Sequence, residues 1–167
     1  MNFQECVSFQ LNRESNFCKT VTQYFNEKNQ NIETAVQLII ENTLSALNFQ
    51  CNQNNKAEEI YKIAKGCFGV RLNNFFTTEH DHILSKGKGI IAEIFGMDLV
   101  GIIDAIAAKS LVPYHIINTL TALIAPVALA TLNQINVQNS FTSGKMSAWL
   151  AGQPLKTPLA MMHYQPV

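Results

Sequence analysis

The chain has 167 residues, of which 47% are hydrophobic and only 14% are charged, with 12 basic and 12 acidic side chains. This apolar content excludes a disordered chain and is sufficient for one domain with a buried core. The zero net charge excludes a general binder of nucleic acids or anionic membranes, because both need a surplus of Lys and Arg. The charges are also unevenly distributed: every acidic residue lies at or before Asp104, and only two lysines follow Lys109.

The cellular location is judged from the first residues and from the cysteines. Residues 1–10 contain no basic segment and no continuous apolar run, so we expect no signal peptide and a cytoplasmic location. The four cysteines, Cys6, Cys18, Cys51 and Cys67, have no C-x-x-C spacing. We interpret them as reduced thiols that mostly fill the core.

In the first part of the chain, apolar residues recur every three or four positions, which predicts helices with one buried face. The clearest such helix covers residues 32–47, and a shorter one precedes it over 17–25. The amide-rich stretch 51–55 predicts a loop. Its last residue, Asn55, is expected to cap a helix over 56–68.

Residues 69–97 are less regular than the segments around them. Gly87-Lys88-Gly89 predicts a bend, and Gly96 predicts the end of a helix. We expect Asp98 to cap the next helix, which covers residues 99–109.

A long apolar segment follows and predicts a helix from Pro113 to about Leu132 with a kink at Pro126. It is long enough to span a bilayer. His115, Asn118 and several threonines interrupt it, however, so we predict a buried helix of a soluble domain and no membrane span. A polar loop over 133–139 and a short last helix over 140–151 complete the predicted elements.

Two helix pairs, over 21–48 and 102–133, resemble each other. Each has a short helix, a turn and a long apolar helix that ends in L-x-x-L-N. This similarity indicates either a duplicated helical hairpin or the general likeness of two buried Leu-rich helices. We predict a single all-α domain over residues 1–153, a bundle of about seven to eight helices, followed by an extended or flexible tail over 154–167.

A family resemblance rests on the second helix pair and the segment after it. The matching strings are Phe95-Gly96, the helix over 99–108, the Leu-Ile-Ala-Pro-Val-Ala-Leu centre of 116–132, and Met146-Ser147-Ala148-Trp149-Leu150-Ala151-Gly152-Gln153. They resemble the YidB-like bacterial family of unknown function, nine-three-seven, and most of all the version found ahead of OmpA-like domains. The resemblance covers about residues 17–153. It implies an all-helical fold without established catalytic residues, and it allows an association with the cell envelope.

One cluster, Glu79-His80-Asp81-His82, has the side chains that bind divalent transition metals. Residues two apart on a helix point in different directions, so His80 and His82 chelate one ion only from an extended backbone. His115 or His163 is then a distant third ligand. We favour a solvated polar loop, and a metal-dependent hydrolase is the least favoured function.

The sequence contains no other catalytic signature. It has no G-x-S-x-G motif, no histidine beside a cysteine, and no P-loop spacing around Lys86-Gly87-Lys88-Gly89. We therefore predict no catalytic residue, no cofactor and no enzymatic activity. Trp149 is expected to pack the last helix against the core, and the alternative is an anchor for a protein partner. His115 is expected to be partly buried.

The segment 110–144 carries no formal charge. Either the rest of the domain buries this uncharged segment or a second chain covers it, and we favour burial within the domain. For function we favour a non-enzymatic bacterial binding or scaffold module with a protein partner or self-association. The alternative is a small apolar-ligand or lipid-binding protein with a groove between the helix pairs.

Overall fold

The computed structural model describes residues 1–13, 16–70 and 78–154, except for the side chains of 78–80. These residues form an all-helical fold with no strand, as the sequence predicts. The helices are α1 (Phe3–Leu11), α2 (Phe17–Phe25), α3 (Asn29–Asn52), α4 (Ala57–Gly66), α5 (Thr78–Phe95), the 3₁₀ turn η1 (Gly96–Asp98), α6 (Leu99–Ser110), α7 (Tyr114–Gln138) and α8 (Ser143–Ala151).

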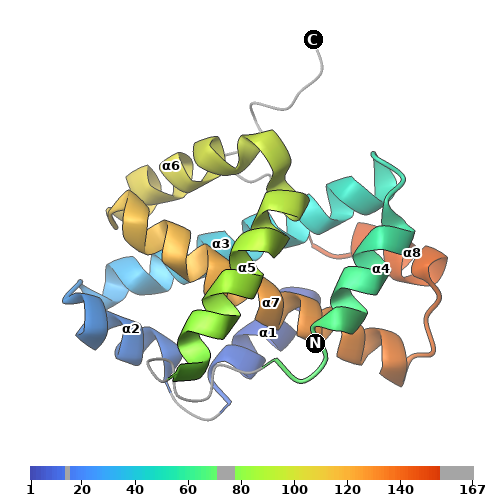
Figure 1. Cartoon of the computed structure of the whole chain (residues 1–167), viewed down its shortest axis with the longest axis horizontal. Helices are drawn as coiled ribbons and strands as arrows, with labels where there is room; N and C mark the ends of the chain where they lie inside the picture. Colours follow the sequence, from blue (N-terminus) through green and yellow to red (C-terminus); the bar gives the residue numbers. More distant parts are fainter. Residues whose placement is uncertain (14–15, 71–77, 155–167) are drawn as a thin grey trace.

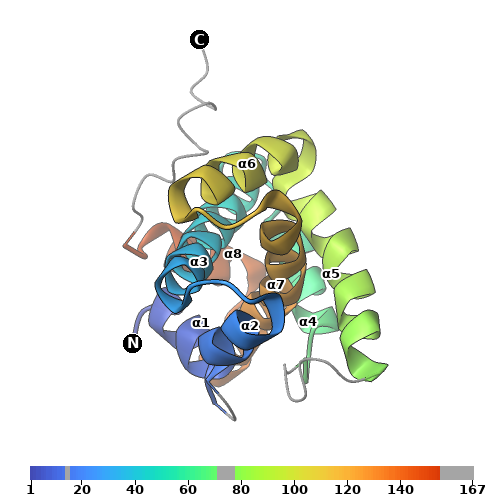
Figure 2. The same ribbon diagram turned by 90° about the vertical axis from the view of Figure 1, so that its left-hand side faces the viewer.

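Helix α7 is the centre of the fold. Helices α1, α3, α4, α5 and α6 all pack against it (Figure 1). In the side view of Figure 2, α7 lies between α3 and α5. It is long and apolar enough to cross a membrane, but 78% of its most apolar window is buried inside the domain. The uncharged segment that forms α7 is therefore largely buried within the domain, as the sequence predicts.

Both predicted helical hairpins are present: α2 with α3, and α6 with α7. Helix α2 packs on α3, and α6 packs on α7. The long helices α3 and α7 contact each other, while α4 packs on α7 and α8 packs on α3. Each long helix is thus covered by a short helix that follows the other one in the chain.

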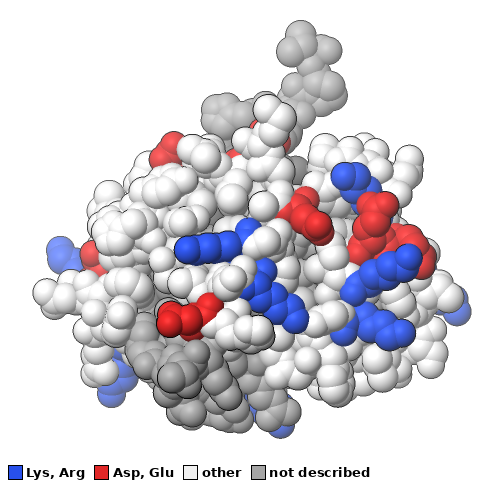
Figure 3. Space-filling model, viewed as in Figure 1, with Lys and Arg blue, Asp and Glu red and all other residues white. Residues whose placement is uncertain are grey.

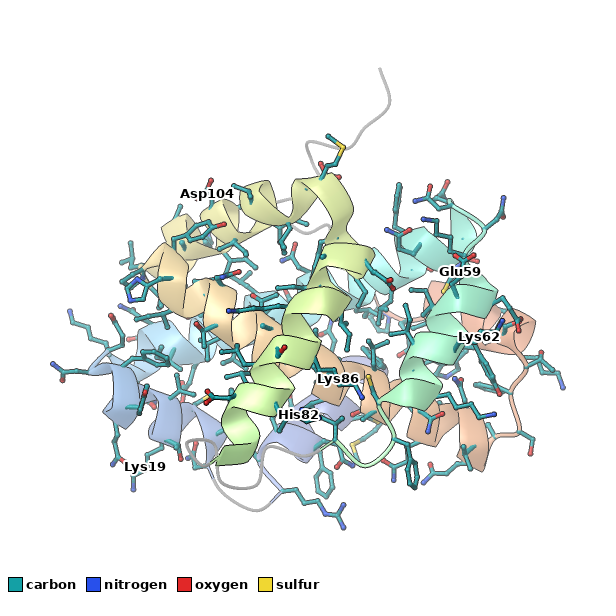
Figure 4. All side chains as sticks on the ribbon, in the orientation of Figure 1. Lys19, Glu59, Lys62, His82, Lys86 and Asp104 are labelled. Carbon is teal, nitrogen blue, oxygen red and sulfur yellow. The ribbon has the colours of Figure 1, made fainter. Side chains whose placement is uncertain are left out.

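The prediction of a bend at Gly87 is wrong, because Gly87 lies inside helix α5 where this helix contacts α7. Helix α5 continues through Gly87 and Gly89 without a break. A Cβ atom at Gly87 would overlap the backbone carbonyl of Ala122, so glycine is needed here for the close approach of two helices. Beside it, the Lys86 Nζ donates a hydrogen bond of 2.6 Å to the Gly66 carbonyl at the end of α4 (Figure 4). This bond places a cation at the negative end of α4.

Helix α1 was not among the predicted elements. Its first turn is held by a capping box, in which the Asn2 side chain accepts from the Glu5 amide and the Glu5 carboxylate accepts from the Asn2 amide. Three side chains spaced four residues apart are buried against the rest of the domain: Phe3, Val7 and Leu11.

Gln153 joins the start of α1 to the end of α8. Its Oε1 accepts a hydrogen bond of 2.8 Å from the Phe3 amide, and its Nε2 donates to the Trp149 carbonyl at 3.3 Å. The first bond satisfies one of the free amides of the first turn of α1. The glutamine that ends the family-like string 146–153 therefore holds the two ends of the described chain together.

Several helix boundaries also differ from the prediction. Asn55 does not cap α4: its φ of 54° is left-handed, and Lys56 occupies the cap position without a side-chain bond. Asp98 precedes α6 but makes no side-chain cap, and Gly96 ends α5 with a φ of 58°, as expected. Both long helices continue into their predicted loops, α3 as far as Asn52 and α7 as far as Gln138.

Candidate functional site

The best candidate site is a groove between the end of α1, the end of α4 and the C-terminal half of α7. It has a volume of about 350 Å³. We call it the α1–α7 groove. Its walls combine apolar side chains with amides and one cation: Gln10, Arg13, Phe68, Gly69, Val70, Val127, Ala130, Thr131, Asn133, Gln134, Val137 and Gln138.

Two large apolar side chains of this groove are exposed to solvent. Phe68, just after α4, is 82% exposed, and Val137 on α7 is 70% exposed. Phe9 on α1 is also exposed and lies four residues before Arg13, which follows the end of α1. Exposed apolar groups that gather at a concave surface are typical of binding sites, whereas single ones are ordinary.

The polar side chains of the groove are mostly amides. The Gln10 Nε2 donates to the Gln134 Oε1 at 3.3 Å and so links α1 to α7. Arg13 is the single charged residue among those that line the groove, and the described residues give it no ion pair. This rim suits a ligand that presents hydrogen-bonding groups and at most one negative charge near Arg13.

The candidate metal ligands lie on a helix. Residues 80 and 82 are both in α5, where positions two apart are separated by about 200° around the axis, so the extended backbone needed for chelation is absent. His82 is exposed and carried by the first half of α5 (Figure 4). Among the described residues, no group of three metal-binding side chains is found. The side chain of His80 and the whole of His163 lie outside the described residues.

The remaining sequence candidates are a tryptophan and a histidine. The half-buried Trp149 ring lies edge-on to Phe3 with centroids 6.1 Å apart, and its centroid is 6.4 Å from that of Phe141. The ring therefore packs α8 against α1 and against the loop before α8. His115 is exposed at the start of α7, so the prediction of a partly buried histidine is wrong.

The four cysteines are free thiols, and the surroundings of three of them disfavour a reactive thiolate. Cys51 and Cys67 are buried. Burial raises the pKa of Cys51 to about 11 and also raises the pKa of Cys67, although nearby Lys86 acts in the opposite direction. The pKa of Cys18 is raised by burial and then by the charge of Glu33. A catalytic thiol needs a lowered pKa, so these three cysteines are unsuited to nucleophilic chemistry.

The described residues thus define an all-helical domain with an open, amide-rimmed apolar groove. The chain belongs to a family of bacterial proteins of unknown function, DUF937, whose model matches residues 10–134. This match confirms the resemblance to family nine-three-seven. No curated protein and no solved structure matches the chain.

Sequence reasoning missed the groove because its walls come from three distant segments. The match to the family ends within α7, before Val137, and begins at Gln10 near the end of α1. No spacing in the sequence links Gln10, Phe68 and Gln134.

Proposed function

We propose that the protein is a non-enzymatic bacterial binding module that holds a protein partner in the α1–α7 groove. The observation that carries this proposal is the exposure of Phe68 and Val137 at the edge of one groove. Their apolar surface is removed from water when a partner side chain enters, which is the usual source of affinity at such sites.

The composition of the groove favours a partner protein. Protein interfaces combine an apolar centre with a polar rim, and hydrogen bonds on that rim fix the orientation of the partner. Here Gln10, Gln134 and Gln138 supply donors and acceptors around the apolar residues. The proposed location is the cytoplasm, which fits four free thiols.

The test compares capture by matched variants. Wild-type protein and the double variant Phe68→Ser, Val137→Ser are immobilised and exposed to native bacterial lysate. Both side chains are exposed, so we expect the variant to fold normally. Because it lacks the apolar contacts of the groove, we expect it to capture about tenfold less of the partner than the wild type does. Capture is measured by quantitative mass spectrometry.

Met97→Ser is the matched control, because Met97 is a fully exposed apolar residue in η1, outside the groove. It should retain the partner at the wild-type level. Equal capture by the wild type and the groove variant contradicts the proposal, as does the same loss in the control.

A second candidate is a small apolar ligand or lipid in the same groove. Its volume of about 350 Å³ is within the range of small-molecule sites, and Arg13 would face a carboxylate or phosphate head. Native mass spectrometry of freshly purified protein tests this. An added mass that is absent from the Phe68→Ser, Val137→Ser variant supports the ligand, and a bare mass of 18.6 kDa opposes it.

A further inference from the structure

One wall of the α1–α7 groove is the turn at the end of α4, residues 66–70, which we call the α4 turn. Its residues Phe68, Gly69 and Val70 line the groove, and Phe68 is 82% exposed. Gly69 has a left-handed φ of 79°, which glycine adopts without strain. Because α7 forms the facing wall, the position of the α4 turn relative to α7 sets the width of the groove and the place of the Phe68 ring.

The backbone hydrogen bonds of the α4 turn are local. The amides of Cys67, Phe68 and Val70 each donate to the carbonyl three residues earlier, at 3.0, 3.3 and 3.1 Å. Such bonds fix the shape of a turn, but they do not fix its position relative to another helix. Of the hydrogen bonds within the described part of the chain, the bond of 2.6 Å from the Lys86 Nζ to the Gly66 carbonyl joins this turn to α5.

Lys86 is itself held at a fixed place beside α7. The next residue, Gly87, lies so close to Ala122 of α7 that a Cβ atom would overlap the Ala122 carbonyl. Helices α4 and α5 both pack on α7, and the Lys86 side chain extends from α5 to the end of α4 (Figure 4). The bond therefore connects the α4 turn with α7 through α5. It also sets an ammonium group at the negative end of α4, where the last carbonyls lack partners within the helix.

We propose that Lys86 is a positioning residue of the α1–α7 groove, whose bond to Gly66 holds the α4 turn where Phe68 meets the partner. This inference rests on the proposed partner site and names a residue that controls the site from outside. Lys86 does not line the groove, so its effect on binding acts through the α4 turn. Without the bond, the turn is held by its local bonds and by packing, and it opens more often. A partner must then order the turn when it binds, which lowers the affinity.

The charges around Lys86 provide a matched control. Figure 3 shows basic side chains over α5 and both signs of charge over α4, so another lysine of this face can reproduce the loss of one positive charge. Lys88 is exposed on α5 and lies about 200° around the helix axis from Lys86. The described residues give Lys88 no hydrogen bond to α4. Lys88→Met therefore removes the same charge and leaves the bond to Gly66 in place.

The first experiment measures amide hydrogen exchange by NMR in the free protein. Lys86→Met keeps a long apolar side chain and removes the donor, so the amides of Phe68 and Val70 should exchange about tenfold faster than in the wild type. Lys86→Arg supplies a cation and a donor again and should restore slow exchange. Lys88→Met should exchange as the wild type does. The amide of Ile63, inside α4, should be unaffected in every variant.

The second experiment repeats the capture from native bacterial lysate with the same variants. Lys86→Met should capture about fivefold less of the partner, whereas Lys86→Arg and Lys88→Met should capture as much as the wild type does. The urea midpoint should be the same for the two methionine variants, because both lysines are exposed. A loss of capture at an equal midpoint shows that the position of the α4 turn has changed and not the stability of the domain.

Unchanged exchange of the α4 turn in Lys86→Met overturns this proposal, and so does equal capture by Lys86→Met and the wild type. Losses that Lys86→Arg does not restore, or that Lys88→Met shares, also overturn it. If the wild type captures no partner that the Phe68→Ser, Val137→Ser variant loses, the proposed function fails. The exchange rates still decide in that case whether Lys86 positions the wall of the groove, so the two failures are distinct.

Discussion

The two long helices α3 and α7 have almost the same length, 24 and 25 residues, but different kinds of contacts hold them in place. Polar side chains of α3 reach other helices. The Gln50 Nε2 donates to the Ile94 carbonyl of α5 at 2.8 Å. Asn52 and Ser147 of α8 exchange two hydrogen bonds, of 2.7 and 3.1 Å.

The buried hydroxyl groups of α7, in contrast, bond back to their own helix. Thr121 donates to the Ile117 carbonyl and Thr131 to the Val127 carbonyl, at 2.7 and 2.8 Å. These bonds satisfy the hydroxyls but fix no neighbour. The side-chain bonds that α7 makes to other helices are longer ones, from the exposed Gln10 of α1 to Gln134 at 3.3 Å and from Asn136 to the Met146 Sδ of α8 at 3.2 Å. The position of α7 therefore depends mainly on apolar packing and shape, whereas α3 is held more by directional bonds between helices.

The largest expected effect comes from a change in shape beside α7. Gly87→Ala places a methyl group where the Ala122 carbonyl lies, so α5 must move away from α7. We expect a loss of about 3 kcal/mol in the free energy of unfolding, measured by urea denaturation. Gly89→Ala is the control: it meets no atom within 4 Å and should stabilise α5 by about 0.5–1 kcal/mol. Equal effects of the two changes would contradict the role of shape.

Gly87 also shows where the sequence was sufficient for prediction and where it was not. A glycine in a helix indicates either a break or a close approach, and only the neighbouring helix decides between them. The periodic helices α3, α6 and α7 could be predicted because each has enough apolar residues to define a buried face. Helix α1 was missed, although Asn2 and Glu5 have the spacing of a capping box.

The candidate site could be predicted from the sequence less well than the fold. The exposure of Phe68 and Val137 depends on which neighbours cover them, and those neighbours belong to other helices. For the metal candidates His80 and His82 the sequence predicts a solvated polar loop, whereas both residues lie in helix α5, whose geometry separates the two positions. The long periodic helices were therefore predictable, whereas several helix ends and the long-range assembly were not.

The second prediction tests the directional bonds of α3. Gln50→Leu removes the donor to the Ile94 carbonyl and the acceptor for the Asn54 amide, which are bonds of 2.8 and 3.0 Å. We expect a loss of about 2 kcal/mol in the free energy of unfolding, because a buried carbonyl is left unpaired. Gln30→Leu, at an exposed position in the first turn of α3, should change it by less than about 0.5 kcal/mol. Similar losses in both variants would indicate that helix propensity, and not the bond to α5, is measured.

The third prediction concerns the pH dependence of stability. It tests α3 and not α7, because residues 116–138 of α7 contain no titratable side chain. The pKa of Cys51 rises from 9.0 to about 11 on burial in α3. Between these values the unfolded chain releases the thiol proton and the folded chain keeps it, so stability falls as pH rises, by at most about 1.4 kcal/mol per pH unit.

Cys51→Ala should remove this contribution. Urea denaturation at pH 8, 9 and 10 measures the free energy of unfolding of both proteins. Their difference should narrow as pH rises, because only the wild type loses the stability that depends on the protonated thiol. A difference that stays constant over this range would contradict the expected titration of Cys51.

The smallest expected effect is a gain in stability at an unpaired hydroxyl group of α3. Ser45 is buried, and its Oγ has no hydrogen-bond partner among the residues that the structure describes, so its hydroxyl has lost water without compensation. Ser45→Ala should raise the free energy of unfolding by about 1 kcal/mol, since alanine removes this group and favours the helix. Thr121→Val on α7 is the matched comparison and should give no gain, because that hydroxyl is paired with the Ile117 carbonyl. Calorimetric melting of the two variants measures the contrast, and a loss of stability in Ser45→Ala would show that its hydroxyl is needed in α3.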